Sequence, residues 1–106
     1  MEISDIYVHD AQLHRVIEDI ETDTLTMEVE YPVDSERNVF ERRLLVFDDV
    51  HSYQVFEQPF HGSPTILDAE VVATEGRWIR LRLDTNAGRR ELSCTGVRLC
   101  EYDRVA

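Results

Sequence analysis

Hydrophobic and polar residues alternate with a period of two along much of this chain. The clearest example is Leu25 to Tyr31, where every second residue is apolar and Thr or Glu lies between. This period is typical of a β-strand with one face in a core and the other in water. The sequence also predicts that Pro32 ends this strand, because proline cannot donate a hydrogen bond to a neighbouring strand.

Shorter segments of the same character follow, separated by polar residues. The turns between them contain Asp, Asn or Gly, which tolerate the backbone conformations of tight turns. The segment 58–64 holds two of the three prolines and one of the four glycines, so we expect it to join two halves of the chain. Further strands are predicted at 39–47, 50–57, 66–74, 78–84, 89–95 and 97–102.

Residues 10–20 permit two interpretations. Asp10 could cap a helix, and four apolar residues follow it at helical spacing: Leu13, Val16, Ile17 and Ile20. Against a helix, His9–Leu13 resembles Leu67–Val71, and that second segment continues into β-branched residues without a helical stripe. We expect a strand, because two copies of one motif should share a conformation.

The two halves carry related hairpins. Leu44–Tyr53 has the pattern of an apolar strand, a corner at Asp48 and Asp49, and a second strand. Glu91–Cys100 repeats this pattern, with an arginine pair just before each strand. Asp is favoured at corners because its carboxylate bonds nearby backbone groups, which accounts for both acids without catalysis.

The match extends to the earlier strands of each half. Aligned in this way, Phe47 corresponds to Cys94, Met27 to Ile79 and Asp10 to Asp68. The differences in spacing fall in loops, where insertions are tolerated. We therefore expect an internal duplication of a four-stranded unit, with pseudo-repeats at about 6–57 and 65–104 joined by 58–64.

Eight short strands with frequent turns predict an all-β fold. The expected architecture is an antiparallel sandwich or a small barrel, and the sequence pattern leaves these two alternatives open. At 106 residues the chain has the length of a single domain, 1–106, that can bury its own core.

The charge is strongly negative and unevenly distributed. The chain has 22 acidic residues, 11 arginines and no lysine, for a net charge of −11. Residues 1–64 hold 15 acids and 4 arginines, whereas 65–106 hold 7 of each. Such a field repels nucleic acid and favours a cationic protein partner, although acidic charge also serves simply to keep a domain soluble. The predicted partner-binding residues are Glu28, Glu30, Asp34, Glu36, Asp48 and Asp49.

A stripe of arginines suggests self-association. Arg80 and Arg82 occupy the wet face of a predicted strand, as Glu28 and Glu30 do on the strand around Val29. If these strands are neighbours, the side chains form cross-strand ion pairs. If they are not, the arginines are a candidate homodimer interface with the acidic half of a second copy.

The sequence contains no convincing catalytic or cofactor motif. The spacing of His9, His14, His51 and His61 matches no metal-binding scheme, so no metal or cofactor is expected. Ser63 and Ser93 lack the glycine-flanked turn of hydrolase nucleophiles. We therefore expect a protein that is not an enzyme.

The cysteines and the N-terminus bear on location. Cys94 and Cys100 are predicted to fill core positions, which fits a reducing compartment. The N-terminus lacks the basic region of a secretory signal, and no apolar run approaches the ~20 residues of a membrane span. A cytoplasmic protein without membrane association is expected.

Two segments resemble those of small bacterial proteins of uncharacterised function. His9–Leu13 resembles their N-terminal His-Asp-Ala-x-Leu, and Leu45–Val50 resembles their Leu-x-Phe-x-x-Val hairpin. Some proteins of this kind are thought to be immunity proteins that block toxins, so the resemblance implies binding to a protein partner. It assigns no functional residues.

The expected function is therefore binding, to a protein partner or to a second copy. Two alternatives remain open at this level. One is a small-molecule-binding barrel with Trp78 and Tyr53 in its pocket. The other is a small metal-dependent enzyme that uses the histidines.

Overall fold

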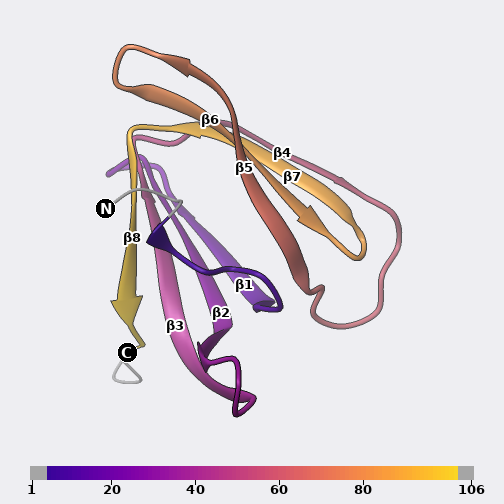
Figure 1. Ribbon diagram of the computed structural model, residues 1–106. Coiled ribbons are helices and arrows are strands. Elements are labelled where there is room, and N and C mark those ends of the chain that lie inside the picture. Colours follow the sequence, from indigo (N-terminus) through magenta and orange to yellow (C-terminus); the bar gives the residue numbers. More distant parts are fainter. Residues whose placement is uncertain (1–4, 103–106) are drawn as a thin grey trace.

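The computed structural model describes residues 5–102, which form eight β-strands and no α-helix (Figure 1). Within this range no helix has the length and apolar character needed to cross a membrane. The strands are β1 (Gln12–Asp19), β2 (Thr24–Asp34), β3 (Val39–Asp48), β4 (His51–Glu57), β5 (Ile66–Glu75), β6 (Trp78–Thr85), β7 (Gly88–Cys94) and β8 (Gly96–Glu101).

The strands form two antiparallel four-stranded sheets that face each other. The first sheet has the order β1-β2-β3-β8 and the second β4-β7-β6-β5. In Figure 1 the sheets meet along one side and diverge on the other, and they do not close into a barrel. The prediction of an all-β antiparallel fold is confirmed, and of the two predicted architectures the sandwich is the observed one.

Two local predictions have different outcomes. Residues 12–19 form strand β1, so the strand interpretation of this ambiguous segment is confirmed. The prediction that Pro32 ends its strand is wrong, because β2 continues to Asp34 and Pro32 lies opposite Phe40. Strand β1 pairs with β2 only as far as Glu30, so one side of Pro32 faces no neighbour and its missing N–H breaks no ladder bond.

The two pseudo-repeats exchange their fourth strands. Strands β1, β2 and β3 take β8 as their neighbour, and β5, β6 and β7 take β4. The same connectivity in both halves fits a duplicated unit. It also means that neither pseudo-repeat contains a complete sheet, because each sheet draws its last strand from the other half.

The observed strand register shows that the predicted alignment of Met27 with Ile79 is wrong by two residues, because Met27 corresponds to Leu81. Leu45 lies opposite Met27, and its counterpart Leu92 lies opposite Leu81 and not Ile79. A displacement of two leaves every side chain on the same face of its strand, so the hydrophobic pattern alone could not detect it. Asp10 and Asp68 are not equivalent either, since Asp10 has a positive φ of 72° before β1 whereas Asp68 lies within β5.

Two corners carry the chain from one sheet to the other. Asp49, with a φ of 53°, lies between β3 and β4, and Thr95 lies between β7 and β8. The corners are in contact: the Thr95 N–H donates to the carbonyl oxygen of Asp48 (3.0 Å) and its hydroxyl donates to Asp49 Oδ2 (2.6 Å). Arg98 then forms a bidentate ion pair with the Asp48 carboxylate, at 2.9 and 3.0 Å. The two aspartates thus lie at the predicted corner, but their carboxylates bind Arg98 and Thr95 from the other half and not the nearby backbone groups that the sequence analysis expected.

The core lies between the sheets and is formed by both halves. Phe47 is the largest of the completely buried side chains, and it belongs to a buried cluster with residues from six other strands. The other completely or almost completely buried hydrophobic residues on the strands are Leu13, Leu25, Met27, Val29, Leu45, Ile66, Leu81, Leu83, Leu92, Cys94 and Val97.

We expect Phe47→Ala to lower the free energy of unfolding by about 3–5 kcal/mol, because it removes a buried ring and leaves a cavity. Phe60→Ala is the matched control, since Phe60 is 45% exposed, and should change stability by less than about 0.5 kcal/mol. Urea denaturation of both variants measures the difference. Equal effects would show that the side chain of Phe47 does not hold the two sheets together.

Candidate functional site

The two glutamates of the predicted acidic face lie on the outer face of the first sheet and are bound by one arginine. Arg42 Nη1 donates to Glu28 Oε1 (2.6 Å), and Arg42 Nε donates to Glu30 Oε1 (3.0 Å). Desolvation lowers the pKa of Arg42, but the hydrogen bonds that it donates to both carboxylates, together with their negative charge, outweigh this and raise the pKa above its ordinary value. Glu28 is only 7% exposed, so this carboxylate is a structural partner of Arg42 and not an open contact point.

The remaining predicted acids lie at the two ends of β3. Asp34 and Glu36 are at the tip of the β2–β3 hairpin, where Asp34 accepts a hydrogen bond from the Arg37 N–H (3.1 Å) and Glu36 is exposed. Asp48 and Asp49 belong to the corner at the other end. The structure therefore does not bring the six residues together on one surface.

The predicted arginine stripe is paired within the chain. Strands β2 and β6 lie in different sheets, so Arg80 and Arg82 do not meet Glu28 and Glu30. Arg82 instead pairs with Glu70 (2.6 Å). The partners of Arg80 are Glu91, Gln54, Ser93 and the carbonyl oxygen of Ser52.

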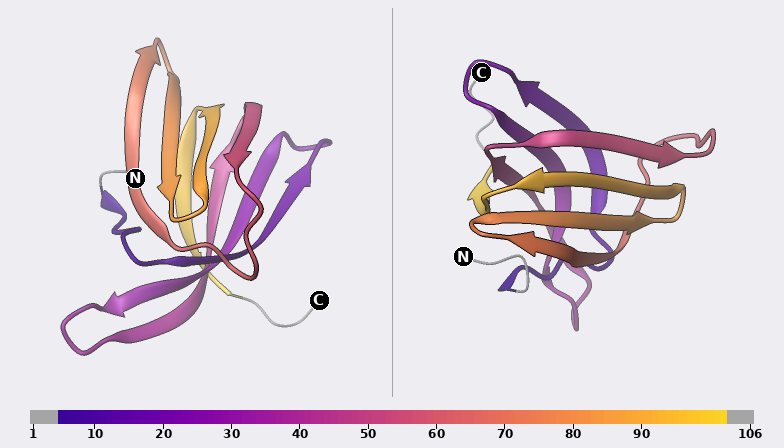
Figure 2. Two further views of the ribbon diagram at one scale, coloured as in Figure 1. Left: turned by 90° about the vertical axis from the view of Figure 1, so that its right-hand side faces the viewer. Right: turned by 90° about the horizontal axis from the view of Figure 1, so that it is seen from above.

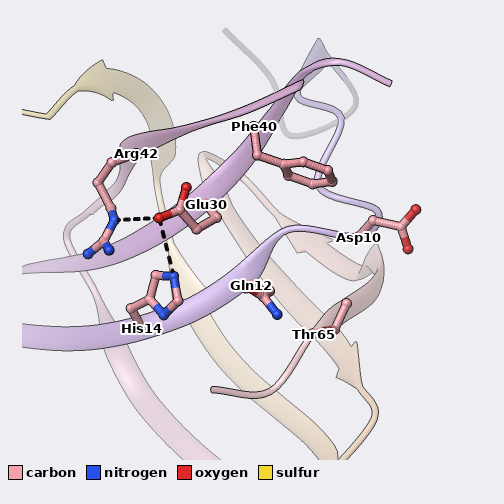
Figure 3. Close-up of a pocket in the computed structure, with 7 residues that line it drawn as sticks. All are labelled: Asp10, Gln12, His14, Glu30, Phe40, Arg42 and Thr65. Carbon is pink, nitrogen blue, oxygen red and sulfur yellow. Dashed lines mark hydrogen bonds and ion pairs between the residues drawn. The ribbon is translucent and has the colours of Figure 1, made fainter. Parts of the chain in front are cut away.

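An open pocket of about 530 Å³ lies between the start of β1 and the β2–β3 hairpin. Figure 3 shows Glu30 between Arg42 and His14 on one side, and Phe40 above the opening. The His14 ring nitrogen Nε2 is 3.6 Å from Glu30 Oε1. The complete lining is Asp10, Gln12, His14, Glu30, Phe40, Arg42 and Thr65. The pocket can accept a polar or cationic group with an apolar contact to Phe40.

A second polar cluster lies where β4 pairs with β7. Arg90 forms two hydrogen bonds with the Glu57 carboxylate, at 2.7 and 2.8 Å, and a third with the Tyr53 hydroxyl at 2.9 Å. The bonds from Arg90 lower the pKa of Glu57, and the bonds to Glu57 raise the pKa of Arg90. Burial raises the pKa of Tyr53, although the charge of Arg90 opposes this.

Sequence reasoning missed this cluster. Glu57 and Arg90 are 33 positions apart and come together only because β4 joins the sheet of the other half. Nothing in the local pattern of either strand signals the pair.

The cysteines and histidines take separate positions. Cys94 is completely buried in the core, where desolvation raises the pKa of its thiol to about 11, and Cys100 is half-buried on β8. His51 packs against Trp78 with ring centroids 5.2 Å apart. Within residues 5–102, no group of three or more His, Cys, Asp or Glu side chains is arranged to hold a metal ion.

Glu57→Gln should lower the free energy of unfolding at neutral pH by about 1–3 kcal/mol, because Arg90 loses its charged acceptor in a largely buried position. The pKa of Glu57 is lowered by folding, so its contribution is present above the unfolded carboxyl pKa of about 4.3 and is lost as the pH falls through the folded value. The difference in the free energy of unfolding between wild type and variant should therefore become smaller at acidic pH. Urea titrations from pH 7 to pH 3 measure it, with the exposed Glu21→Gln as control, and a difference independent of pH would contradict the assignment.

Comparison with known proteins gives no functional assignment. No family model, curated protein or solved structure matches this chain. The resemblance to immunity proteins therefore stays an expectation, and the function has to be argued from the side chains and surfaces described above.

Proposed function

We propose that this chain is a cytoplasmic binding domain that holds a cationic segment of a protein partner, in the manner of an immunity protein. The observation that carries the proposal is the groove below the β2–β3 hairpin. Figure 2 shows this hairpin projecting beyond the body of the sandwich. The pocket of about 530 Å³ opens beside it, between the hairpin and the start of β1.

The hairpin offers apolar contacts for a partner. Val33, Val39 and Phe40 are 40%, 43% and 36% exposed, which is unusual for three apolar side chains so close along the chain. Exposed apolar residues gathered beside polar groups are typical of protein-binding surfaces. Phe40 also lines the pocket, so a partner side chain that entered it would pack against an aromatic ring.

The charges around the groove favour a cationic partner. Arg42 neutralises part of the carboxylate charge of Glu28 and Glu30, but Asp10 also lines the pocket and Glu36 is exposed at the hairpin tip. The net charge of −11 would attract a basic partner from a distance and raise the association rate. Of the six acids predicted from sequence, Glu36 thus offers the best contact point, followed by Asp34, whose carboxylate is half exposed and pairs with the exposed Arg37 (3.6 Å).

The other expected roles receive less support from the geometry. Arg80 and Arg82 already have carboxylate partners, so a dimer formed through them would have to replace ion pairs within each copy. Tyr53 is bound by Arg90 and Trp78 packs on His51, and neither residue lines the two pockets of about 530 and 350 Å³.

A peptide library selected on the immobilised full chain tests the proposal without a known partner. The enriched peptides should combine Arg or Lys with an aromatic or aliphatic residue, and they should bind more weakly at higher salt. The triple variant Asp34→Arg, Glu36→Arg, Phe40→Ala should weaken binding at least about tenfold, since it removes both charge attraction and an anchor ring.

The matched control is Glu21→Arg with Glu75→Arg, which changes the charge by the same amount at exposed sites away from the hairpin. Its effect should be small at moderate salt, where distant charges are screened. Enriched peptides without basic residues, or an equal loss in the control variant, would refute the proposed surface.

A further inference from the structure

The loop that joins the two halves places a serine against a histidine. Ser63 Oγ lies 2.7 Å from His14 Nδ1, although the two residues are 49 positions apart. The loop is fixed at this place, because the Leu13 N–H donates to the carbonyl oxygen of Pro64 (2.9 Å) and Gln12 forms a β-bridge with Thr65. The contact between hydroxyl and imidazole is therefore supported by backbone pairing on both sides.

His14 occupies an irregularity in its strand. The register of β1 against β2 shifts between Leu13 and Arg15, so His14 has no partner residue on β2. Bulges of this kind redirect a side chain and occur frequently beside functional sites. The bulge allows His14 to reach Ser63 in the joining loop and Glu30 on the neighbouring strand.

Glu30 lies on the other side of the imidazole from Ser63. Its Oε1 atom lies 3.6 Å from His14 Nε2, and Arg42 Nε holds the same oxygen at 3.0 Å (Figure 3). A carboxylate on this side favours the tautomer with the proton on Nε2, which leaves Nδ1 free to accept the Ser63 proton. The negative charge also stabilises the imidazolium that such a transfer would create.

Ser63 and His14 open onto a pocket of about 350 Å³ that Pro64, Leu13 and Val16 also line. Arg15 and Arg90 contribute cations to the same lining. Arg90 is bound to Glu57, whereas in residues 5–102 the side chain of Arg15 has no hydrogen bond or ion pair with the protein. A free guanidinium beside a nucleophile can stabilise an oxyanion.

We propose that Ser63 is a nucleophile, with His14 as its general base and Glu30 as a positioning residue, and that the site hydrolyses small carboxylic esters. Ser63 Oγ attacks the ester carbonyl carbon while its proton passes to His14 Nδ1. The tetrahedral oxyanion collapses, the alkoxide leaves with the proton from His14, and an acyl-serine remains. Water, deprotonated by His14, then releases the acid and regenerates the serine, so ester and water give acid and alcohol.

This inference does not rest on the proposed binding function. Ser63 does not line the groove beneath the β2–β3 hairpin. Ser63→Ala should therefore abolish ester hydrolysis and leave peptide binding unchanged. The hairpin triple variant should weaken peptide binding and leave ester hydrolysis unchanged.

The first test is covalent labelling of the purified full chain with a fluorophosphonate, whose fluoride leaves when the serine attacks phosphorus. Mass spectrometry should find one adduct, on Ser63. Ser63→Ala should remove it, and Ser35→Ala on the hairpin tip should retain it. A chain that is not labelled, or is labelled equally in Ser63→Ala, would overturn the proposal.

The second test separates base catalysis from structural support. His14→Ala should slow labelling and the hydrolysis of 4-nitrophenyl acetate by about 10²–10⁴-fold, and added imidazole should restore part of the rate. Glu30→Asp should keep more activity than Glu30→Gln, because it retains the charge. Thermal melts verify that each variant is folded. A folded His14→Ala variant with an unchanged rate, or one that imidazole does not rescue, would exclude His14 as the base.

Discussion

The contact between the two sheet-switching corners is the constraint on which the rest of the fold depends. Thr95 donates to Asp48 and Asp49, and Arg98 binds the Asp48 carboxylate from the neighbouring strand. Each corner sends a strand into the opposite sheet, so the core can form only when both halves of the chain are present. A change at this contact would disturb both sheets together, since β8 and β4 start from it.

The exchange of strands between the two halves also determines which charged side chains form ion pairs. Most arginines with acidic neighbours are paired across strands, as Arg42 is with Glu28 and Glu30 and Arg82 is with Glu70. The excess negative charge predicted from sequence is therefore spread unevenly over the surface. It is reduced on the outer faces of the sheets and remains open at two chain reversals, the β1–β2 connection with Glu18, Asp19, Glu21 and Asp23 and the β2–β3 hairpin tip with Glu36. The positions of the paired arginines therefore decide which carboxylates remain open at the surface.

Two distinct surfaces meet at His14. On one side it lines the groove below the hairpin, and on the other it contacts Ser63 and the pocket that contains Arg15. Strand β1 lies at the edge of its sheet and carries a bulge there, so its side chains reach both sides. This explains how a small sandwich can present the proposed binding surface and the proposed reactive site close together.

The sequence by itself determined the all-β fold and its strands. The alternation from Leu25 to Tyr31 is a local signal, and the strand that it predicted is observed. Residues 12–19 also form a strand, but that prediction came from the resemblance to Leu67–Val71, because local spacing alone also permitted a helix. The corner position of Asp48 and Asp49 followed from turn chemistry. The two-residue displacement between the repeats was hidden because it moves no side chain to the other face. Only the tertiary structure decided which strands are neighbours, and therefore that Glu57 meets Arg90 and His14 meets Ser63. These residues are 33 and 49 positions apart. Their hydrogen bonds depend on the exchange of strands and on the path of the joining loop, which leave no pattern in the local sequence.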